Sequence, residues 1–431
     1  MVDISAGAPR PHVNPLGSTA MSDLFQVLRD GRPRTRAELA AITGLARTTV
    51  AARLDALTGL GLIGSVGEAA STGGRPSSLF AITASGRFVI GVDVGASHVR
   101  VALSDITGRI LEETNSLIPV AEGPRIVLAA AVRSARELVE RAGRRIEDLL
   151  AVGVGVPGPV EFSSGRPINP PIMPGWDRFD VAGWIRQELD VPVLVDNDVN
   201  IMALGEREHA WPDVHHLLFV KVATGIGAGV ISGGFLQRGA QGTAGDIGHV
   251  YVARGAEVAC SCGNFGCLEA IASGSAIARS LTAAGTPAAN SRDVVDLVKN
   301  GNIDATQAVR QAGRDLGEVL TTCVSLMNPS VIVLGGAMAE AGEHLIAGVR
   351  EVVYRRSMPL ATESLHITLS QTGADAAVLG AAMLAIHHSL SPANIEAMIA
   401  GSSVGFIRPV ESAPRVRRDR PEAEVGGTVV G

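Results

Sequence analysis

The chain has 431 residues, of which 46% are hydrophobic and 19% charged, with very few aromatic residues. This composition predicts a globular protein with an aliphatic core and room for two to four domains. It excludes a membrane-spanning protein, because no apolar run is long enough to cross a bilayer, and the first residues lack the pattern of a signal peptide. We therefore expect a cytoplasmic protein with no membrane partner.

The charge is distributed unevenly along the chain. The net charge of −6 argues against nucleic-acid binding by the chain as a whole, but residues 1–87 contain nine arginines against six acidic residues. A mildly basic module on an acidic body is the asymmetry expected of a DNA-binding head. The N-terminal part of the chain is therefore where we look for a DNA-binding unit.

Residues 20–84 have the pattern of a winged helix-turn-helix domain. A short helix is predicted over residues 35–43, with a capping-box pattern at its start, and a longer helix follows over residues 47–60. The tight turn between them contains Gly44, as helix-turn-helix motifs require. Two strands, at residues 62–64 and 78–82, are expected to form the hairpin of the wing.

The candidate DNA contacts lie at the start of the second helix and in the loop of the hairpin. In a helix-turn-helix motif the start of the second helix meets base edges in the major groove, which places Arg47, Thr48 and Thr49 there, with Arg53 farther along. Arg75 in Gly-Gly-Arg-Pro is suited to a narrow minor groove. The alternative is a helical hairpin with solvated arginines, but the two elements together favour DNA binding.

From Phe88 on, the sequence alternates between strands and helices. Residues 89–103 and 217–231 share the pattern strand, glycine turn, strand, which suggests a duplicated body of two lobes with a cleft between them. We expect lobes at residues 88–200, completed by a helix near 374–387, and at 201–373. Strands are predicted at 88–94, 99–103, 150–156, 191–195, 217–222, 229–231 and 331–334, and helices at 124–142, 179–189, 275–283, 304–327, 341–355 and 374–387.

The two ends of the chain differ from the body. Residues 1–19 are polar and contain proline, and residues 389–431 combine Pro, Ser, Arg and Glu with little periodicity. Both are predicted to be largely disordered, although residues 394–400 have the pattern of a short helix.

The two glycine turns of the body are suited to phosphate groups. The first contains Asp93 and Gly95, and the second contains Thr224, Gly225 and Gly227. Backbone N–H groups at such turns bind anions. The alternative is that the glycines serve only the packing of buried hairpins.

Between the two turns, Asn197 and Asp198 follow an apolar strand, where open α/β sheets bind ligands. A carboxylate there can take a proton from a substrate hydroxyl during phosphoryl transfer. The alternative is an Asx-rich turn that starts the next helix.

Three of the four cysteines, Cys260, Cys262 and Cys267, lie within eight positions, and His249 lies eleven residues upstream of them. Three thiols and one imidazole form a complete tetrahedral shell for structural zinc. Such a closed site holds a loop in place and does no chemistry itself. The alternative is a chance cluster of buried thiols. The polar residues that the loop would position for a hydroxyl-rich ligand are Asp246, His249 and Glu269.

Taken together, these motifs resemble the ROK family of repressors and sugar kinases. The winged helix that ends in Gly-Arg-Pro resembles the repressor branch of that family. The motifs occur in the family's order and span most of residues 88–386. They are Gly-Val-Asp-Val-Gly at 91–95, Gly-Val-Pro-Gly-Pro at 155–159, Asp-Asn-Asp at 196–198, Thr-Gly-Ile-Gly at 224–227, Ala-Gly-Asp-Ile-Gly-His at 244–249, the cysteine motif at 260–269 and Asn-Pro-Ser-Val-Ile-Val-Leu-Gly-Gly at 328–336.

The resemblance implies an actin-like, hexokinase-type body with a ribonuclease-H-like fold and a sugar in its cleft. Asn197 and Asp198 would contact sugar hydroxyls, and Asp198 would also be the catalytic base of a kinase. Asp246, His249 and Glu269 would contact the sugar from the other side. Structural Zn²⁺ would be bound by His249, Cys260, Cys262 and Cys267, with one ring nitrogen of the histidine on zinc and the other available to the sugar.

The sequence departs from the family pattern at several positions. Ala96 and His98 replace a glycine and a lysine of the kinases' first phosphate loop, and Ala223 replaces a glycine in the second. Asp246 stands where the family has Glu, which leaves more room for a ligand. Ala46 replaces a serine cap of the recognition helix. The changes in the two loops weigh against ATP and Mg²⁺ as cofactors.

The sequence therefore predicts a sugar-responsive repressor that binds operator DNA as a homodimer or homotetramer. Sugar or phosphosugar binding would alter lobe closure and so the spacing of two winged helices on DNA. Two alternatives remain: an ATP-dependent sugar kinase with a DNA-binding head, and a regulator whose signal is a partner protein.

Overall fold

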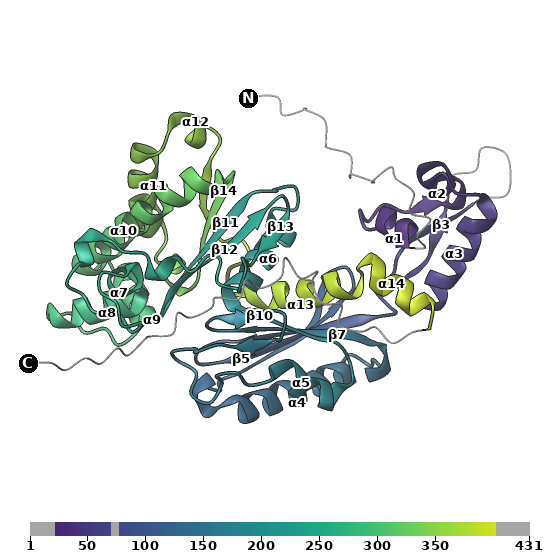
Figure 1. Cartoon of the computed structure of the whole chain (residues 1–431), viewed down its shortest axis with the longest axis horizontal. Coiled ribbons are helices and arrows are strands. Elements are labelled where there is room, and N and C mark those ends of the chain that lie inside the picture. Colours follow the sequence, from purple (N-terminus) through teal and green to yellow (C-terminus); the bar gives the residue numbers. More distant parts are fainter. Residues whose placement is uncertain (1–21, 70–76, 402–431) are drawn as a thin grey trace, which may run out of the picture.

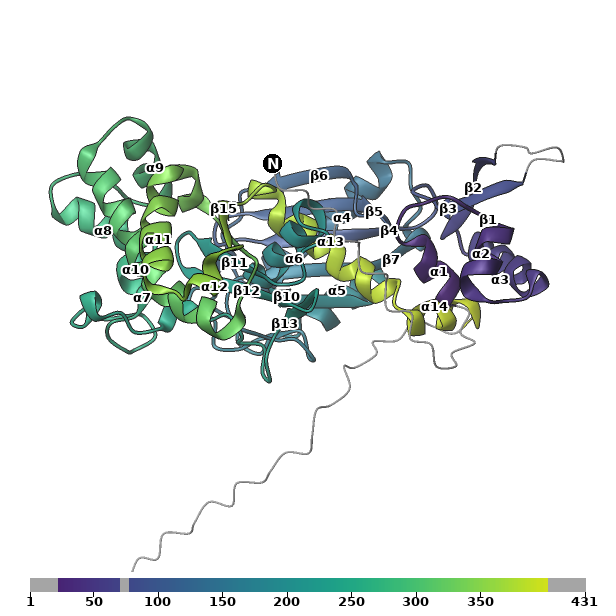
Figure 2. The same ribbon diagram turned by 90° about the horizontal axis from the view of Figure 1, so that it is seen from above.

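The structure, a computed structural model, describes residues 22–69 and 77–401. Figures 1 and 2 show a small helical head at one end of the molecule and two α/β sheets with their helices in the middle and at the other end. Arg75, the segment 1–19 and most of the tail lie outside the described residues.

The head, residues 22–82, packs three helices against a three-stranded sheet of order β1-β3-β2. Its interior is formed by fully buried apolar side chains such as Phe25 and Leu54. The predicted capping box is present, because the Thr35 side chain accepts from the Glu38 backbone and the Glu38 side chain accepts from the Thr35 backbone. The elements are α1 (Ser22–Leu28), β1 (Arg34–Thr35), α2 (Arg36–Thr43), α3 (Arg47–Gly59), β2 (Ile63–Glu68) and β3 (Ser78–Ile82).

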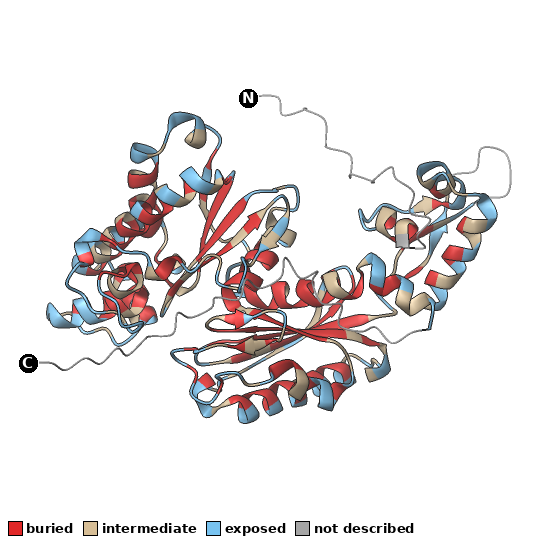
Figure 3. Cartoon of the chain, viewed as in Figure 1, coloured by how far each residue is buried: buried red, intermediate tan, exposed pale blue. Residues whose placement is uncertain are grey.

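The first sheet of the body has the order β10-β7-β4-β5-β6. Strands β10, β7 and β4 are parallel, β5 runs antiparallel to β4, and β6 runs antiparallel to β5. Helices α4 and α5 cover one face and α13 the other, so that the strands are buried (Figures 1 and 3). The bounds are β4 (Phe88–Val94), β5 (Val99–Asp105), β6 (Ile110–Ser116), α4 (Pro124–Arg141), β7 (Leu149–Val156), α5 (Val181–Leu189), β10 (Val193–Asn197) and α13 (Ala376–Ser389), with the short hairpin β8 (Val160–Glu161) and β9 (Arg166–Pro167).

The second sheet has the order β13-β12-β11-β14-β15. One face packs on α6 and the other on a layer of helices, chiefly α10 and α11. The bounds are α6 (Asp198–Ala210), β11 (Leu217–Val222), β12 (Ile226–Ser232), β13 (Phe235–Gln237), η3 (Ile247–His249), α7 (Leu268–Ala272), α8 (Gly274–Ala283), α9 (Ser291–Lys299), α10 (Ile303–Met327), β14 (Val331–Gly335), α11 (Glu343–Arg356), α12 (Pro359–Thr362) and β15 (His366–Leu369).

Helix α6 lies between the two sheets and contacts α13 through backbone. A β-carbon added to Gly380 would lie 1.6 Å from the Ile201 carbonyl oxygen, and one added to Gly205 would lie 2.1 Å from the Ala376 carbonyl oxygen. Only glycine permits this approach. Because α6 packs on both sheets, the lobe boundaries 88–200 and 201–373 stay a prediction.

The chain beyond α13 continues into a short helix. Residues Pro392–Ile399 form α14, which starts at a Ser391 cap and packs on α1 of the head. The Gln26 side-chain amide also donates to the Leu390 carbonyl oxygen at 3.1 Å. The short helix expected at residues 394–400 is thus present as α14, held by a distant part of the chain, and the rest of the predicted disordered tail, from residue 402 on, lies outside the described residues.

Among the described residues, no single helix is long and apolar enough to cross a membrane. Segments Gly373–Ser389 and Pro392–Ile399 pass such a test only as a pair bent by 58°. Most side chains of α13 are buried inside the protein, as expected of a core helix.

Candidate functional site

Acidic side chains gather where the parallel strands of the first sheet end. Asp93 on β4 and Asp196 on β10 both pair in register with Gly155 on β7, so they lie in one row across three strands. Asp198 follows at the first position of α6. Asp93, Asp196 and Asp198 are all less than 8% exposed. Burial of several carboxylates is costly unless each is paired, so their partners decide what this site does.

Asp196 and Asn197 are engaged in structural contacts. Asp196 accepts from the Asn200 amide at 2.8 Å and from Arg238 Nε at 2.7 Å, and that guanidinium stacks on the Phe162 ring. Asn197 Oδ1 caps α6, and its Nδ2 donates to the Gly158 carbonyl oxygen at 2.8 Å. The expected Asx turn at a helix start is thus present. A sugar contact by Asn197 stays a prediction.

Asp198 is paired with a lysine that the sequence analysis did not single out. Lys221 on β11 places its Nζ 2.5 Å from Asp198 Oδ2. Burial alone would lower the pKa of Lys221, but the charge and hydrogen bond of Asp198, together with the charge of Asp93, raise it. The sequence feature that could have indicated this pair is the single lysine within the apolar strand Leu-Leu-Phe-Val-Lys-Val, because a buried strand rarely carries an unpaired charge.

The first glycine turn is covered by the histidine that replaces the kinases' lysine. Gly95 N donates to the His98 carbonyl oxygen at 2.9 Å, and His98 Nε2 lies 3.2 Å from Asp93 Oδ2. A β-carbon on Gly95 would lie 2.1 Å from the His98 ring, so the imidazole packs directly on the turn. Glycine is required at position 95 because a side chain there would clash with the His98 ring. The Gly95 N–H is already engaged by the His98 carbonyl oxygen.

The second glycine turn is covered by Glu269 of α7. Glu269 Oε2 accepts from Ile226 N at 2.9 Å, and it lies 2.5 Å from the position of a β-carbon on Gly225. Thr224 is exposed. Gly227 packs against Val199, the residue after Asp198. These contacts bring Asp198, the second turn and Glu269 into one neighbourhood.

Asp246 precedes η3 and His249 is its last residue, and η3 contacts β12 and α7. A β-carbon on Gly248 would lie 2.4 Å from the Ile226 carbonyl oxygen and 3.5 Å from Glu269, which places the η3 turn against the second glycine turn. Asp246 is exposed. A sugar contact by Asp246, His249 or Glu269 stays a prediction, but these residues lie on contiguous elements.

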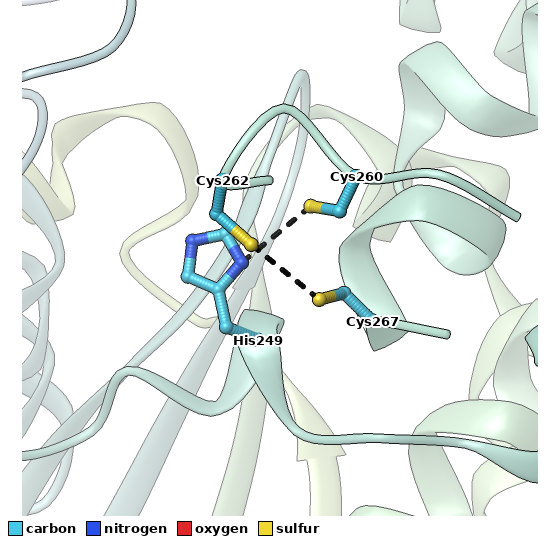
Figure 4. A group of neighbouring side chains, drawn as sticks. All are labelled: His249, Cys260, Cys262 and Cys267. Atoms are coloured by element: carbon cyan, nitrogen blue, oxygen red, sulfur yellow. Dashed lines mark hydrogen bonds between the residues drawn. The ribbon is translucent and has the colours of Figure 1, made fainter. Parts of the chain in front are cut away.

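The three cysteines and the histidine converge on one point (Figure 4). Their four ligand atoms all lie within 4.8 Å of one another. Cys260 Sγ is 3.6 Å from His249 Nδ1, and Cys262 Sγ is 3.7 Å from Cys267 Sγ. Tetrahedral zinc with sulfur ligands at about 2.3 Å separates neighbouring ligand atoms by roughly 3.5–3.8 Å, so the geometry fits the ion. With Nδ1 facing the cluster, the Nε2 atom of His249 is left for another partner.

The acidities of two thiols also fit a metal. A backbone hydrogen bond from Asn264 is the main cause that lowers the pKa of Cys262 to about 7. Burial is the main cause that raises the pKa of Cys267 to about 12, with contributions from the neighbouring thiols. Packed thiols cannot all ionise without a cation among them, and a divalent metal supplies that charge.

The four candidate DNA-contacting residues of α3 differ in how far their side chains are exposed. Arg47 and Thr48 are exposed and Thr49 is partly exposed at the first turn of α3, and Ala46 provides no side-chain cap there. Arg53 is only 6% exposed, which weighs against the predicted contact with DNA. Arg53 lies three residues after Val50 and four before Leu57, on the helical stripe that faces the interior of the head.

The two sheets, with α6 and α13 between them, and the winged-helix head define a regulator built on a sugar-kinase-like body. The family model of the ROK family matches residues 89–388. The chain therefore belongs to the ROK family, as the motifs predicted.

Known proteins agree with this assignment. The chain is 28% identical over 368 residues to the xylose repressor of Bacillus spizizenii, with 85% of this chain and 94% of the repressor covered. A ROK family transcriptional regulator, a homologue of the Escherichia coli MLC protein, matches with a TM-score of 0.75 at 23% identity over 89% of this chain and 98% of that one. The ROK family glucokinase of Streptomyces griseus, in complex with glucose and AMPPNP, has a TM-score of 0.61 at 26% identity, covering 69% and 98%. These comparisons confirm the predicted fold class.

Proposed function

We propose that this protein is a sugar-responsive transcriptional repressor. The match to the xylose repressor extends over head and body, whereas the match to the glucokinase covers the body alone. The observation that carries the proposal is the course of α6, which begins in the polar site at Asp198 and carries Glu208 near its end, where the charge of Glu208 acts on Arg29 beside α1 of the head.

The far end of α6 lies in a group of charges that includes the head. Glu208 on α6 is 3.5 Å from His387 Nε2 on α13. Burial lowers the pKa of Arg29, which follows α1, and the charge of Glu208 opposes that change. Helix α13 then leads into α14, which packs on α1. In this proposal, a ligand that moves the start of α6 changes the contacts of its far end with α13, and through α14 it changes the contact between the body and α1 of the head.

In this proposal the residues around Asp198 bind a sugar, and the zinc cluster fixes the loop that carries His249 and Glu269. The head binds operator DNA through the start of α3. Two copies of the chain would place two heads on DNA half-sites, and a small rotation of each head would change their spacing. Zinc itself would only hold the loop, since its four ligands close the shell.

The proposal is tested with operator fragments selected from random DNA by the full-length protein. Fluorescence anisotropy then measures DNA affinity in the presence of xylose, other neutral sugars and phosphosugars. One of them is expected to change the affinity by about tenfold or more, a usual size for coupling between two sites. The proposal fails if no DNA is enriched, or if no compound in the panel changes the affinity.

The route through α6 is tested with Glu208→Gln. This variant is expected to keep its affinity for DNA and for the sugar while the sugar's effect on DNA binding falls several-fold. Glu188→Gln is the matched control, because Glu188 pairs with Arg136 on the outer helices of the first sheet, away from the head. An unchanged sugar effect in Glu208→Gln would exclude this route.

The second candidate is an ATP-dependent sugar kinase, favoured by the carboxylate of Asp198 at the start of α6 and by the likeness to the glucokinase. Coupled detection of ADP release with the same sugars decides between the two. Turnover above an Asp198→Asn control establishes a kinase, and turnover equal to that control excludes one.

A further inference from the structure

Lys221 lies beside two glycines of the neighbouring strands, and the Phe219 ring and Val199 pack against those glycines. In the second sheet it pairs with Gly227 of β12 and with Gly335 of β14, so neither neighbouring strand places a side chain beside it. Its Nζ reaches Asp198 Oδ2 at the first turn of α6. The lysine thus leaves its own sheet and neutralises a group on the helix between the sheets.

The same ammonium group also acts on a carboxylate of the first sheet. The charge of Asp93 on β4 contributes to the raised pKa of Lys221, so Asp93 lies within electrostatic range. Asp93 is 7% exposed and Asp198 is 5% exposed. Lys221 therefore contacts one nearly buried carboxylate, that of Asp198, and lies within electrostatic range of a second, that of Asp93. His98 adds a hydrogen bond to Asp93 on the side of the first turn.

Carboxylates beside a phosphate-binding turn are the oxygen ligands that Mg²⁺ uses when it accompanies a nucleotide. A metal–nucleotide complex would bring a cation to the carboxylates and an anion to the turns. Here the chain supplies both charges, because Lys221 pairs with the Asp198 carboxylate and the Glu269 carboxylate accepts from the backbone of the second turn. The electrostatic requirements of the site are met without either ligand.

We propose that Lys221 is a built-in replacement for a divalent cation, which fits the site for an uncharged, hydroxyl-rich ligand and makes metal and nucleotide unnecessary. The ligand class rests on the proposed function. The replacement of the cation does not, since it concerns only Lys221 and the two carboxylates, and it can be tested without DNA or sugar.

The test uses Mn²⁺ as the probe, with its binding followed by electron paramagnetic resonance on the zinc-saturated, full-length protein. The wild type is expected to take up no Mn²⁺ at this site. Lys221→Met leaves two carboxylates without a cation and should bind one Mn²⁺ at least about tenfold more tightly than the wild type does. Lys221→Met/Asp198→Asn removes one carboxylate as well and should lose that binding, and Lys221→Arg should behave as the wild type.

Melting temperatures provide the second measurement. Mg²⁺ should raise the melting temperature of Lys221→Met by roughly 3 °C and leave the wild type unchanged, because a ligand stabilises only the form that binds it. The proposal is overturned if folded Lys221→Met binds no more Mn²⁺ than the wild type. It is equally overturned if Lys221→Met fails to fold even with Mg²⁺ while the double variant folds, since a divalent ion then cannot replace the lysine.

Discussion

The two glycine turns have the same strand–turn–strand pattern but are covered by side chains of different chemistry. In the first turn the covering group is His98, which follows Gly95 closely in the sequence and pairs with Asp93. In the second the covering group is Glu269, more than forty residues from the turn, and it pairs with backbone. The first turn is therefore held by its own strand pair, whereas the second depends on the loop of the metal cluster, which precedes α7.

This difference predicts that loss of zinc affects one turn and not the other. Cys267 is 1% exposed and is the N-cap residue of α7, so Cys267→Ser should destabilise the protein by about 3 kcal/mol through loss of the metal and displacement of α7. Hydrogen exchange should accelerate at the Ile226 amide and stay unchanged at Gly95. Cys323→Ser, outside the cluster, is the control. Equal acceleration at both amides would contradict the comparison.

Removal of the covering carboxylate alone should have a smaller effect. Glu269→Ala leaves the Ile226 N–H without its partner, at a cost of about 2 kcal/mol in the free energy of unfolding. Chemical denaturation measures this cost, and zinc content should remain one ion per chain. Glu257→Ala, an exposed acid in the same loop, serves as the control. A stability loss no larger than that of the control would show that the second turn does not need Glu269.

A change in the head should leave both turns as they are. Ala46→Ser supplies the missing side-chain cap of α3 and should stabilise the head by about 1 kcal/mol. The gain is measured as slower hydrogen exchange in α3, with Gly95 and Ile226 amides unchanged. A response at either amide would show that the stability of α3 alone, without DNA or ligand, affects the glycine turns.

The smallest effect is expected at the first turn. The His98 side chain is 35% exposed, so solvent weakens its pairing with Asp93, and His98→Ala should cost only about 0.5 kcal/mol. Denaturation of His98→Ala beside Glu269→Ala compares the two covering groups directly. A larger loss in His98→Ala would reverse the proposed order of the two turns.

Local patterns in the sequence predicted the parts of the site that depend on neighbours in the chain. The capping box at Thr35 and the cysteine cluster follow from spacing alone, and the structure has both arrangements. The pairing of Lys221 with Asp198 could not be predicted, because it depends on which face of β11 meets α6. The burial of Arg53 could have been found, since it shares the helical stripe of Val50 and Leu57.

Distance along the chain also kept the packing partners of α6 and α14 from being predicted. Helix α6 starts directly at the end of β10 with no loop between them, and it packs on both sheets and on α13. Helix α14 is held by α1, more than 350 residues away. In both cases tertiary packing decides the structure, and local propensity carries little of that information.

The backbone contact between Gly205 and Gly380 has a consequence for protein engineering. Helices α6 and α13 are far apart in the sequence but pack against each other backbone to backbone. Any residue larger than glycine at position 205 or 380 would force the two helices apart. A chimera that takes its sugar-binding residues from a relative should therefore exchange both helices together. Exchange of α6 alone would join surfaces that were never matched, and the hybrid would lose its fold before its new specificity could be tested.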